Sequence, residues 1–443
     1  MPYAQGERLP GERASKLGHL DVLKSPLVKE LCKCFEDPSA SRSPKPPPWK
    51  PLTKSDHPLS LIFGVDGSFQ PIESESKPHK AIAFVKTALV MLDQPALAAI
   101  DKSEPHPFAV RDILQQSQLY HATVFPLRYV TVAGQNVYHA IRRVIYDSFC
   151  DPSLDRQVME TFKWIAYEKW DGQQKQLPKF ECPHCHTVDA TLPYDADTGN
   201  CPNPQCGKEL FVTDMLGFHQ VMTDDAAPDA IATDYMGIHE TLLLFTGVRY
   251  FWEKNKSTLD KCLFVKDGPL SIRAQYSKLV NPIRRLLSRA RAEGTAICIM
   301  GQEKSGAFWD HLQLIGDDMP AGTFFIPDHD YIREEIQHRP NTGAKYGKDT
   351  NYGAKVFVKL NDRYRFVLNV PNGSSTDAQD PTLIGSERIF GTLETILSAR
   401  FESALLPVEM AHSVASLSTY PSARVLAMFA EAAKVGAASA KAP

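Results

Sequence analysis

The chain of 443 residues has no long uncharged apolar run. No window reaches the roughly 18 apolar residues that a membrane-spanning helix requires. The best candidate, Ala81 to Ile100, is interrupted by Lys86 and Asp93. No apolar segment follows the charged first residues, so a secretory signal is not expected. We therefore predict a soluble, cytoplasmic protein without a membrane partner.

The sequence also lacks an excess of either charge, with 49 Lys and Arg against 52 Asp and Glu. This balance argues against a protein that coats nucleic acid through overall positive charge, although one surface can still be basic. Hydrophobic residues make up 43% of the chain, which is typical of globular proteins. A chain of this length can bury a large core, so general disorder and a small disulfide scaffold are not expected.

The nine cysteines are an odd number, and four of them form one pattern. Two residues separate Cys182 from Cys185, and four separate Cys201 from Cys206. Each pair presents two thiolates to one ion, and four thiolates close the tetrahedral shell of a structural Zn²⁺. The spacing predicts a zinc ribbon inserted at residues 181–210, with one structural zinc. Four free thiols are the alternative.

Composition divides the rest of the chain into three parts. Residues 1–58 form a Pro-rich arm, because the segment SPKPPPWKP cannot be helix interior. We interpret the arm as a spacer, and a docking peptide is the alternative. Residues 59–180 and 211–420 form one discontinuous domain, followed by an Ala-rich helical tail at 421–443. β-prone runs come first and alternating strands and helices follow, which predicts a mixed α/β sheet flanked by helices.

Two apolar strands end in Asp-Gly, at Asp66 and at Asp267. If these strands are neighbours, the two carboxylates converge, and like charges at close range favour an intervening cation. Oxygen ligands suit Mg²⁺ or Mn²⁺. Because Asp-Gly is also a common turn dipeptide, two ordinary turns are the alternative.

A third carboxylate is expected from the helix before the second of these strands. Glu240 lies among apolar residues, whereas Glu253 has lysines beside it. The two positions are thirteen residues apart, so they lie on different faces of a helix. We therefore predict Glu240, rather than Glu253, as the ligand.

A basic helix is predicted directly after the Asp267 strand, since Ile272 to Ala292 contains no acidic residue. Phosphate contacts dominate the affinity of proteins for nucleic acid. The candidate phosphate ligands are Arg273, Arg284, Arg285, Arg289 and, at the end of the next strand, Lys304. A helix face that pairs with acidic residues elsewhere in the chain is the alternative.

These segments resemble the NurA nuclease family. The motifs GVDGSF, FVKDGPLS, ICIMGQEKSG, VPNG and PVEMAHSVA occur in the family's order, over roughly residues 58–420 without the cysteine insert. The resemblance implies an RNase H-like fold and a metal-dependent DNA nuclease. It also implies a homodimer that works with a HerA-type hexameric ATPase.

On the family pattern, Asp66, Glu240 and Asp267 match the metal-binding carboxylates, and His412 matches the C-terminal histidine. Two features depart from the pattern. Glu240 is further from Asp267 than in the family, and no tyrosine precedes His412 at the expected place. The zinc ribbon is an insertion relative to the simplest members of the family. This insertion suggests the hypothesis that the protein acts in antiviral defence rather than in general DNA repair.

We therefore predict a divalent-metal-dependent DNA nuclease. Asp66, Glu240 and Asp267 are expected to hold two Mg²⁺ or Mn²⁺ ions about 3.5–4 Å apart. His412 is expected to transfer a proton or to hold the scissile phosphate. The main alternative is a catalytically inert nucleic-acid-binding or ATPase-adaptor module of the same fold. A sugar-kinase or actin-like ATPase requires a second glycine-rich phosphate loop, which the sequence lacks.

Overall fold

The computed structural model describes residues 18–35, 47–74, 77–93, 118–340, 342–398, 400, 403–418 and 421–432. The chain divides into two units, Met1–Pro46 and Pro47–Pro443. The boundary at Pro46 leaves the last residues of the predicted arm with the second unit, where they form the edge strand β1 (Lys50–Pro51).

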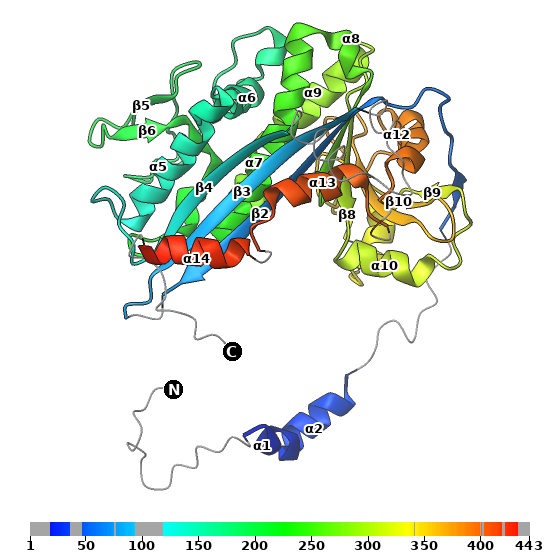
Figure 1. Ribbon diagram of the computed structural model, residues 1–443, viewed down its shortest axis with the longest axis horizontal. Coiled ribbons are helices and arrows are strands. Elements are labelled where there is room, and N and C mark those ends of the chain that lie inside the picture. The colour runs from blue at the N-terminus through cyan, green and yellow to red at the C-terminus, as the bar shows by residue number, and fades with distance from the viewer. Residues whose placement is uncertain are drawn as a thin grey trace. The chain divides into compact units, whose positions relative to one another are not determined.

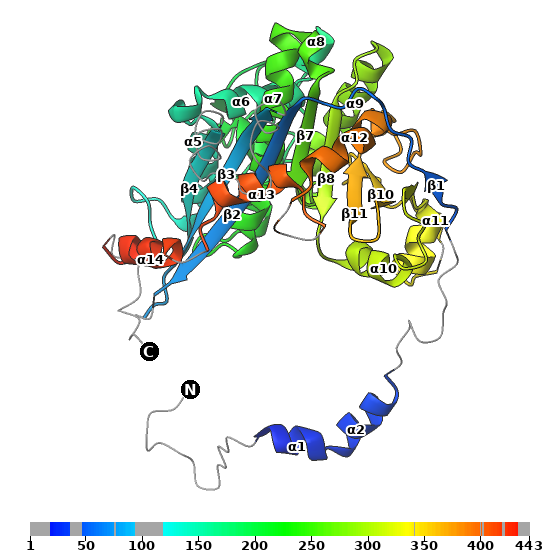
Figure 2. The same ribbon diagram turned by 45° about the vertical axis from the view of Figure 1, so that its right-hand side comes forward.

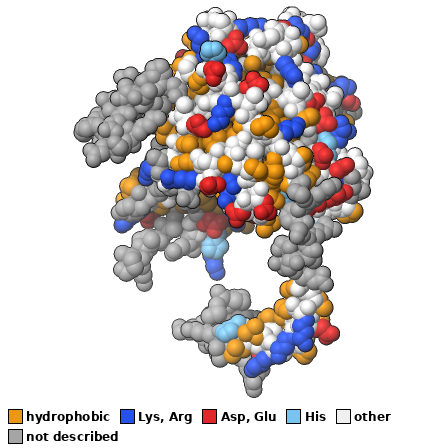
Figure 3. Space-filling view, turned by 90° about the vertical axis from the view of Figure 1, so that its right-hand side faces the viewer, with side chains coloured by type: hydrophobic (Ala, Val, Ile, Leu, Met, Phe, Trp, Pro, Cys, Tyr) orange, Lys and Arg blue, Asp and Glu red, His pale blue; other side chains and the backbone are white. Residues whose placement is uncertain are grey.

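The first unit contains two short helices, α1 (Gly18–Lys24) and α2 (Pro26–Lys33). Ser25 caps the second helix, and Pro26 begins it at a position where a missing N–H group costs little. Both helices present apolar side chains to solvent, next to lysines (Figure 3). These exposed apolar side chains are Val22, Leu23, Leu27 and Leu31, with Phe35 just beyond the second helix.

The second unit is built on a nine-stranded sheet with the order β1-β9-β10-β11-β8-β7-β2-β3-β4 (Figures 1 and 2). The remaining strands are β2 (Leu61–Glu73), β3 (Ala81–Asp93), β4 (Gln118–Arg128), β7 (Cys262–Asp267), β8 (Cys298–Glu303), β9 (Thr323–Phe325), β10 (Ala354–Lys359) and β11 (Arg365–Val370). A separate pair, β5 (Thr198–Asn200) and β6 (Glu209–Phe211), belongs to the cysteine insert.

The directions of the strands are mixed. β2, β3 and β4 form an antiparallel meander, whereas β7 runs parallel to β2 and β8 runs parallel to β7. β9, β10 and β11 continue the sheet as antiparallel neighbours. The predicted α/β architecture, a large mixed sheet flanked by helices with a cysteine insert, is therefore confirmed.

Helices cover both faces of the sheet (Figures 1 and 2). The helices are α5 (Val137–Phe149), α6 (Gln157–Ala166), α7 (Ala230–Lys254), α8 (Lys256–Leu259), α9 (Val280–Ala292), α10 (Ala307–Ile315), α11 (His329–Tyr331), α12 (Ser386–Leu393), α13 (Leu406–Ala415) and α14 (Ser422–Ala432). None of the described helices has the length and apolar character that crossing a bilayer requires.

The central strands β2 and β7 divide their side chains between two cores. Val65 and Phe264 pack in the core formed with α5, α6, α7 and α9. Ile62 and Val265 pack in the core formed with α12 and α13. This alternation follows from the pleat, which directs successive side chains to opposite faces. Because both faces are covered, the parts of the two strands that pair with each other before the aspartates, 61–65 and 262–265, are apolar apart from Gly64.

Candidate functional site

The two aspartates lie next to each other where the pairing of β2 and β7 ends. Val65 is aligned with Lys266 in the parallel register, and Asp66 and Asp267 are the residues that follow this pair. At Gly268 the chain turns away from the sheet with a φ of +85°, a conformation that favours glycine. The sequence predicted convergence on the condition that the two strands are neighbours, and the structure meets that condition. The predicted end of the first strand at Asp66 is wrong, because β2 continues to Glu73 and stays paired with β3.

Asp66 is buried, with only 4% of its surface exposed. Its Oδ1 accepts a hydrogen bond from the backbone N–H of Gly67 at 2.7 Å, and its Oδ2 lies 2.8 Å from Nδ1 of His412. Burial, together with the charges of Asp267 and Glu240, raises the pKa of Asp66 to about 7, although both hydrogen bonds oppose the shift. A nearby cation would relieve this repulsion and favour the ionised form.

His412 is held beside Asp66 by the way α13 packs on β2. A methyl group at position 64 would collide with the carbonyl oxygen of Pro407, so Gly64 permits the close approach of the first turn of α13. After the helix, the backbone N–H of Leu417 donates to Oγ of Ser68 at 3.1 Å. The side chain of His412 is 56% exposed, so the site is open to solvent on this side.

Asp267 is paired with Lys304, which directly follows β8. The Nζ of Lys304 lies 3.0 Å from Oδ1 of Asp267, and both side chains are partly exposed. The register of β7 and β8 aligns Asp267 with Gln302, which brings the lysine two residues later within reach. The structure therefore places Lys304 beside the carboxylates, where a phosphate group could be bound.

Glu240 reaches the same end of the sheet from the opposite face. It is buried on α7, and its Oε2 forms an ion pair with Nζ of Lys266 at 2.7 Å. Its Oε1 fills the space above Gly67, where a methyl group would lie only 2.6 Å away. Burial raises the pKa of Glu240, and the ammonium group of Lys266 counteracts this shift. Since Gly67 and Lys266 face α7, their neighbours Asp66 and Asp267 face α13.

The donor set fits a divalent cation on the α13 face. Asp66 and Asp267 offer adjacent carboxylates there, and mutual repulsion makes their full ionisation costly without a cation. Glu240 is close enough to affect the pKa of Asp66 but is bound to Lys266. In the described part of the chain, these carboxylates form no group of three whose ligand atoms all lie within 4.8 Å of one another.

Glu253 occupies a different environment from Glu240. It is exposed near the end of α7 and lies 3.5 Å from Arg249, one turn earlier. The two glutamates therefore lie on different faces of the helix, as the thirteen-residue spacing indicates. Lys266 was not predicted as part of the site, although a lysine within an apolar strand requires a buried partner and so gave a signal in the sequence.

The predicted phosphate-binding arginines are engaged within the protein. Arg284 is buried, and its guanidinium group donates to the backbone carbonyls of Gly347, Lys348 and Asn351. The prediction of a phosphate contact is therefore wrong for Arg284, because its N–H groups are already used. The other ion pairs are Arg273 with Asp234, Arg285 with Glu168, and Arg289 with Asp171 and Glu293. This arrangement corresponds to the alternative, in which acidic residues elsewhere neutralise the helix.

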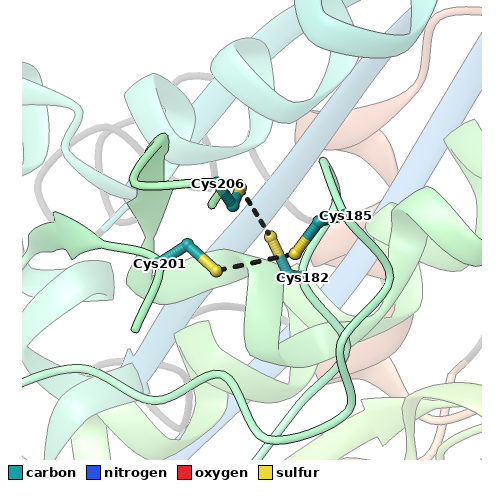
Figure 4. A group of neighbouring side chains, drawn as sticks. All are labelled: Cys182, Cys185, Cys201 and Cys206. Carbon is teal, nitrogen blue, oxygen red and sulfur yellow. Dashed lines mark hydrogen bonds between the residues drawn. The ribbon is translucent and has the colours of Figure 1, made fainter. Parts of the chain in front are cut away.

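The four predicted cysteines form one compact cluster (Figure 4). Their sulfur atoms all lie within 4.8 Å of one another, with Cys182 and Cys206 4.0 Å apart and Cys185 and Cys201 3.7 Å apart. In a tetrahedral site with Zn–S distances of about 2.3 Å, the sulfurs are about 3.8 Å apart. The predicted Cys₄ group is therefore confirmed as a candidate metal site, and its dimensions fit a structural zinc.

No protein-family model matches the chain, and no curated protein matches it in sequence. The candidate sites are thus defined by their own chemistry. One is a thiol cluster of tetrahedral dimensions. The other is a pair of adjacent carboxylates with His412 and Lys304 in contact with them.

Proposed function

We propose that this protein is a divalent-metal-dependent DNA nuclease that also carries one structural Zn²⁺. The observation that carries the proposal is the position of Asp66 and Asp267 where the parallel pairing of β2 and β7 ends, with His412 2.8 Å from Asp66. The meander β2-β3-β4 followed by the parallel strands β7 and β8 supports the RNase H-like arrangement that the NurA resemblance implies. The preference for DNA rests on that resemblance.

When bound, a Mg²⁺ or Mn²⁺ ion would activate water and neutralise charge on the phosphate. Asp66 and Asp267 would hold the first ion, and a second ion would require a ligand such as Glu240, which Lys266 binds in this structure. His412 is exposed and hydrogen-bonded to Asp66, so it can hold a proton at the solvent side of the site. Lys304 can bind a phosphate oxygen in place of Asp267.

The test is incubation of the purified full chain with labelled linear and circular DNA. We expect cleavage with Mn²⁺ or Mg²⁺ and none with EDTA. Cleavage of the circular form would identify endonuclease activity. Absence of cleavage with every divalent ion would overturn the proposal.

A catalytically inert nucleic-acid-binding or ATPase-adaptor module is the second candidate. The ion pairs of Glu240 with Lys266 and of Asp267 with Lys304 favour it, because each lysine already neutralises one carboxylate. Such a module would bind labelled DNA equally well in EDTA and in Mn²⁺ and would leave it uncut.

Glu240→Gln is expected to lower metal-dependent cleavage by at least tenfold, whereas Glu253→Gln should leave it nearly unchanged. Glu240 is buried near Asp66, and Glu253 is exposed and pairs with Arg249. Glu240→Gln also leaves Lys266 buried without its partner, which should cost roughly 3–5 kcal/mol of folding stability. Cleavage rates and urea unfolding of both variants measure these effects.

The double variant Glu240→Gln, Lys266→Met separates the two effects, since it leaves no buried charge without a partner. We expect most of the lost stability to return while cleavage stays low. If cleavage returns together with stability, the carboxylate of Glu240 has only a structural role. If Glu253→Gln abolishes cleavage and Glu240→Gln does not, the assignment on α7 is wrong.

The proposed assembly follows from the NurA resemblance, which implies a homodimer and a HerA-type hexameric ATPase. Light scattering of the purified protein at micromolar concentration is expected to give the mass of two chains. A strict monomer would contradict the homodimer. Co-expression with a HerA-type ATPase should yield a joint complex that acts in DNA end processing or antiviral defence, and separate elution of the two proteins would argue against this partner.

A further inference from the structure

Three neighbouring strands carry a polar residue at the same level of the sheet. Asp66 and Asp267 follow the aligned pair of β2 and β7, and the register of β7 and β8 aligns Asp267 with Gln302. Met300 on β8 packs in the core formed with α12 and α13. Gln302, two residues later, faces the same side, so all three side chains lie on the α13 face.

The side-chain amide of Gln302 is almost fully buried and has a fixed orientation. Only 1% of the residue is exposed, and its Nε2 donates to the backbone carbonyl of Ser403 at 2.5 Å. A carbonyl oxygen can only accept, so the nitrogen end of the amide must face Ser403 and the oxygen must point away from it. Ser403 lies shortly before α13, so the segment that carries His412 also orients Gln302.

The amide oxygen of Gln302 has no hydrogen-bond partner within the described residues, although it is buried. Leaving such an oxygen without a partner costs about 1–3 kcal/mol. Buried polar atoms normally have a partner, so an exception on the strand next to Asp267 requires an explanation. Divalent cations bind amide oxygens as well as carboxylate oxygens, and an amide oxygen adds no charge to the site.

We propose that Gln302 is a metal-binding residue, whose Oε1 supplies a neutral ligand to the divalent ion held by Asp66 and Asp267. This inference rests on the proposed function, because it places the residue at the same ion. A neutral oxygen completes more of the coordination shell without adding a third negative charge beside the aspartates. β8 and the residue after it thereby supply two groups to the site. Gln302 binds the metal ion, and Lys304 binds the phosphate.

The test measures Mn²⁺ affinity of the full chain by electron paramagnetic resonance of the free ion, without DNA. Gln302→Leu is expected to weaken Mn²⁺ binding roughly tenfold. Gln302→Glu is expected to tighten it, because a charged oxygen replaces a neutral one. Asn369→Leu is the matched control, since Asn369 is a buried amide on the next strand whose Nδ2 donates to Glu303 on the opposite face. It should bind Mn²⁺ like the unaltered protein.

Failure of the role of Gln302 can be distinguished from failure of the proposed metal site. Equal Mn²⁺ affinity of Gln302→Leu and the unaltered protein would overturn the role of Gln302. If Asp66→Asn loses Mn²⁺ binding in the same experiment, the proposed metal site at Asp66 and Asp267 still stands. If Gln302→Leu does not fold, Gln302→Glu decides, because unchanged affinity there also overturns the inference. If the unaltered protein binds no Mn²⁺, both fail. If Mn²⁺ binding depends on Gln302 but the protein does not cleave DNA, Gln302 is a metal ligand and the proposed nuclease activity is wrong.

Discussion

Replacing Asp66 by asparagine should lower metal-dependent DNA cleavage by several orders of magnitude. The amide keeps the size of the carboxylate but removes the charge that holds a divalent ion, so metal activation and charge neutralisation are lost together. Asp267→Asn should have a comparable effect, because the two residues are adjacent in the register of β2 and β7. Initial rates on labelled linear DNA in Mn²⁺ measure both variants. Full cleavage by both would contradict the site.

Without bound metal, Asp66→Asn should be more stable than the unaltered protein at pH 8. The pKa of Asp66 is raised from 3.8 to about 7, so between these values the folded state keeps a proton that the unfolded state has released. Stability therefore falls as pH rises from about 4 to 7, by on the order of 4 kcal/mol in total. Asparagine removes this cost, although it weakens the contact with His412.

Urea unfolding in EDTA should show a higher midpoint for Asp66→Asn than for the unaltered protein at pH 8, and little difference at pH 4. Asp147→Asn is the matched control, because Asp147 is exposed and pairs with Arg143 in the previous turn. The urea midpoint of Asp147→Asn should stay close to that of the unaltered protein at both pH 4 and pH 8. If the difference in midpoint between Asp66→Asn and the unaltered protein is the same at pH 4 and pH 8, the carboxyl group of Asp66 is not buried among like charges.

Removing the metal from the Cys₄ cluster should have the largest effect on stability. Structural zinc sites of this kind contribute on the order of 10 kcal/mol in small domains. Cys182 and Cys201 are buried, and they belong to the same hydrophobic core as α5 and α6. Cys201→Ser is therefore expected to reduce the zinc content from about one ion per chain and to lower the melting temperature. The carboxylate site at Asp66 and Asp267 should not be affected.

Cys150→Ser is the matched control for this prediction, since Cys150 is a partly buried thiol outside the cluster. It should retain one zinc per chain and nearly the full melting temperature. Metal analysis and thermal unfolding measure both variants. Zinc-free protein with full stability would contradict the structural role of the cluster.

The Cys₄ group was predictable because its four ligands lie close together in the sequence and their spacing encodes the geometry. The convergence of Asp66 and Asp267 was predictable only as a condition, since the pairing of β2 with β7 joins segments about 200 residues apart. The burial of Glu240 followed from its apolar neighbours. Its approach from the opposite face did not follow, because it depends on which residues of β2 face each layer.

The basic helix shows a further limit of the sequence. Arg285 pairs with Glu168, 117 positions earlier in the chain, and Arg289 pairs with Asp171, 118 positions earlier, in addition to the nearby Glu293. A charge pattern within one helix carries no information about partners at such separations. The burial of Arg284 is equally a tertiary property, since its N–H groups meet carbonyls in a loop 63 to 67 positions later.

The contact between Asp66 and His412 joins residues that are 346 positions apart in the chain. A ribosome that adds about 5–20 residues per second needs roughly 20 to 70 s to cover this interval. During that time β2 and its aspartate already exist, but the helix that carries the histidine does not. The order of synthesis therefore keeps the nascent chain without its complete site until α13 has been made.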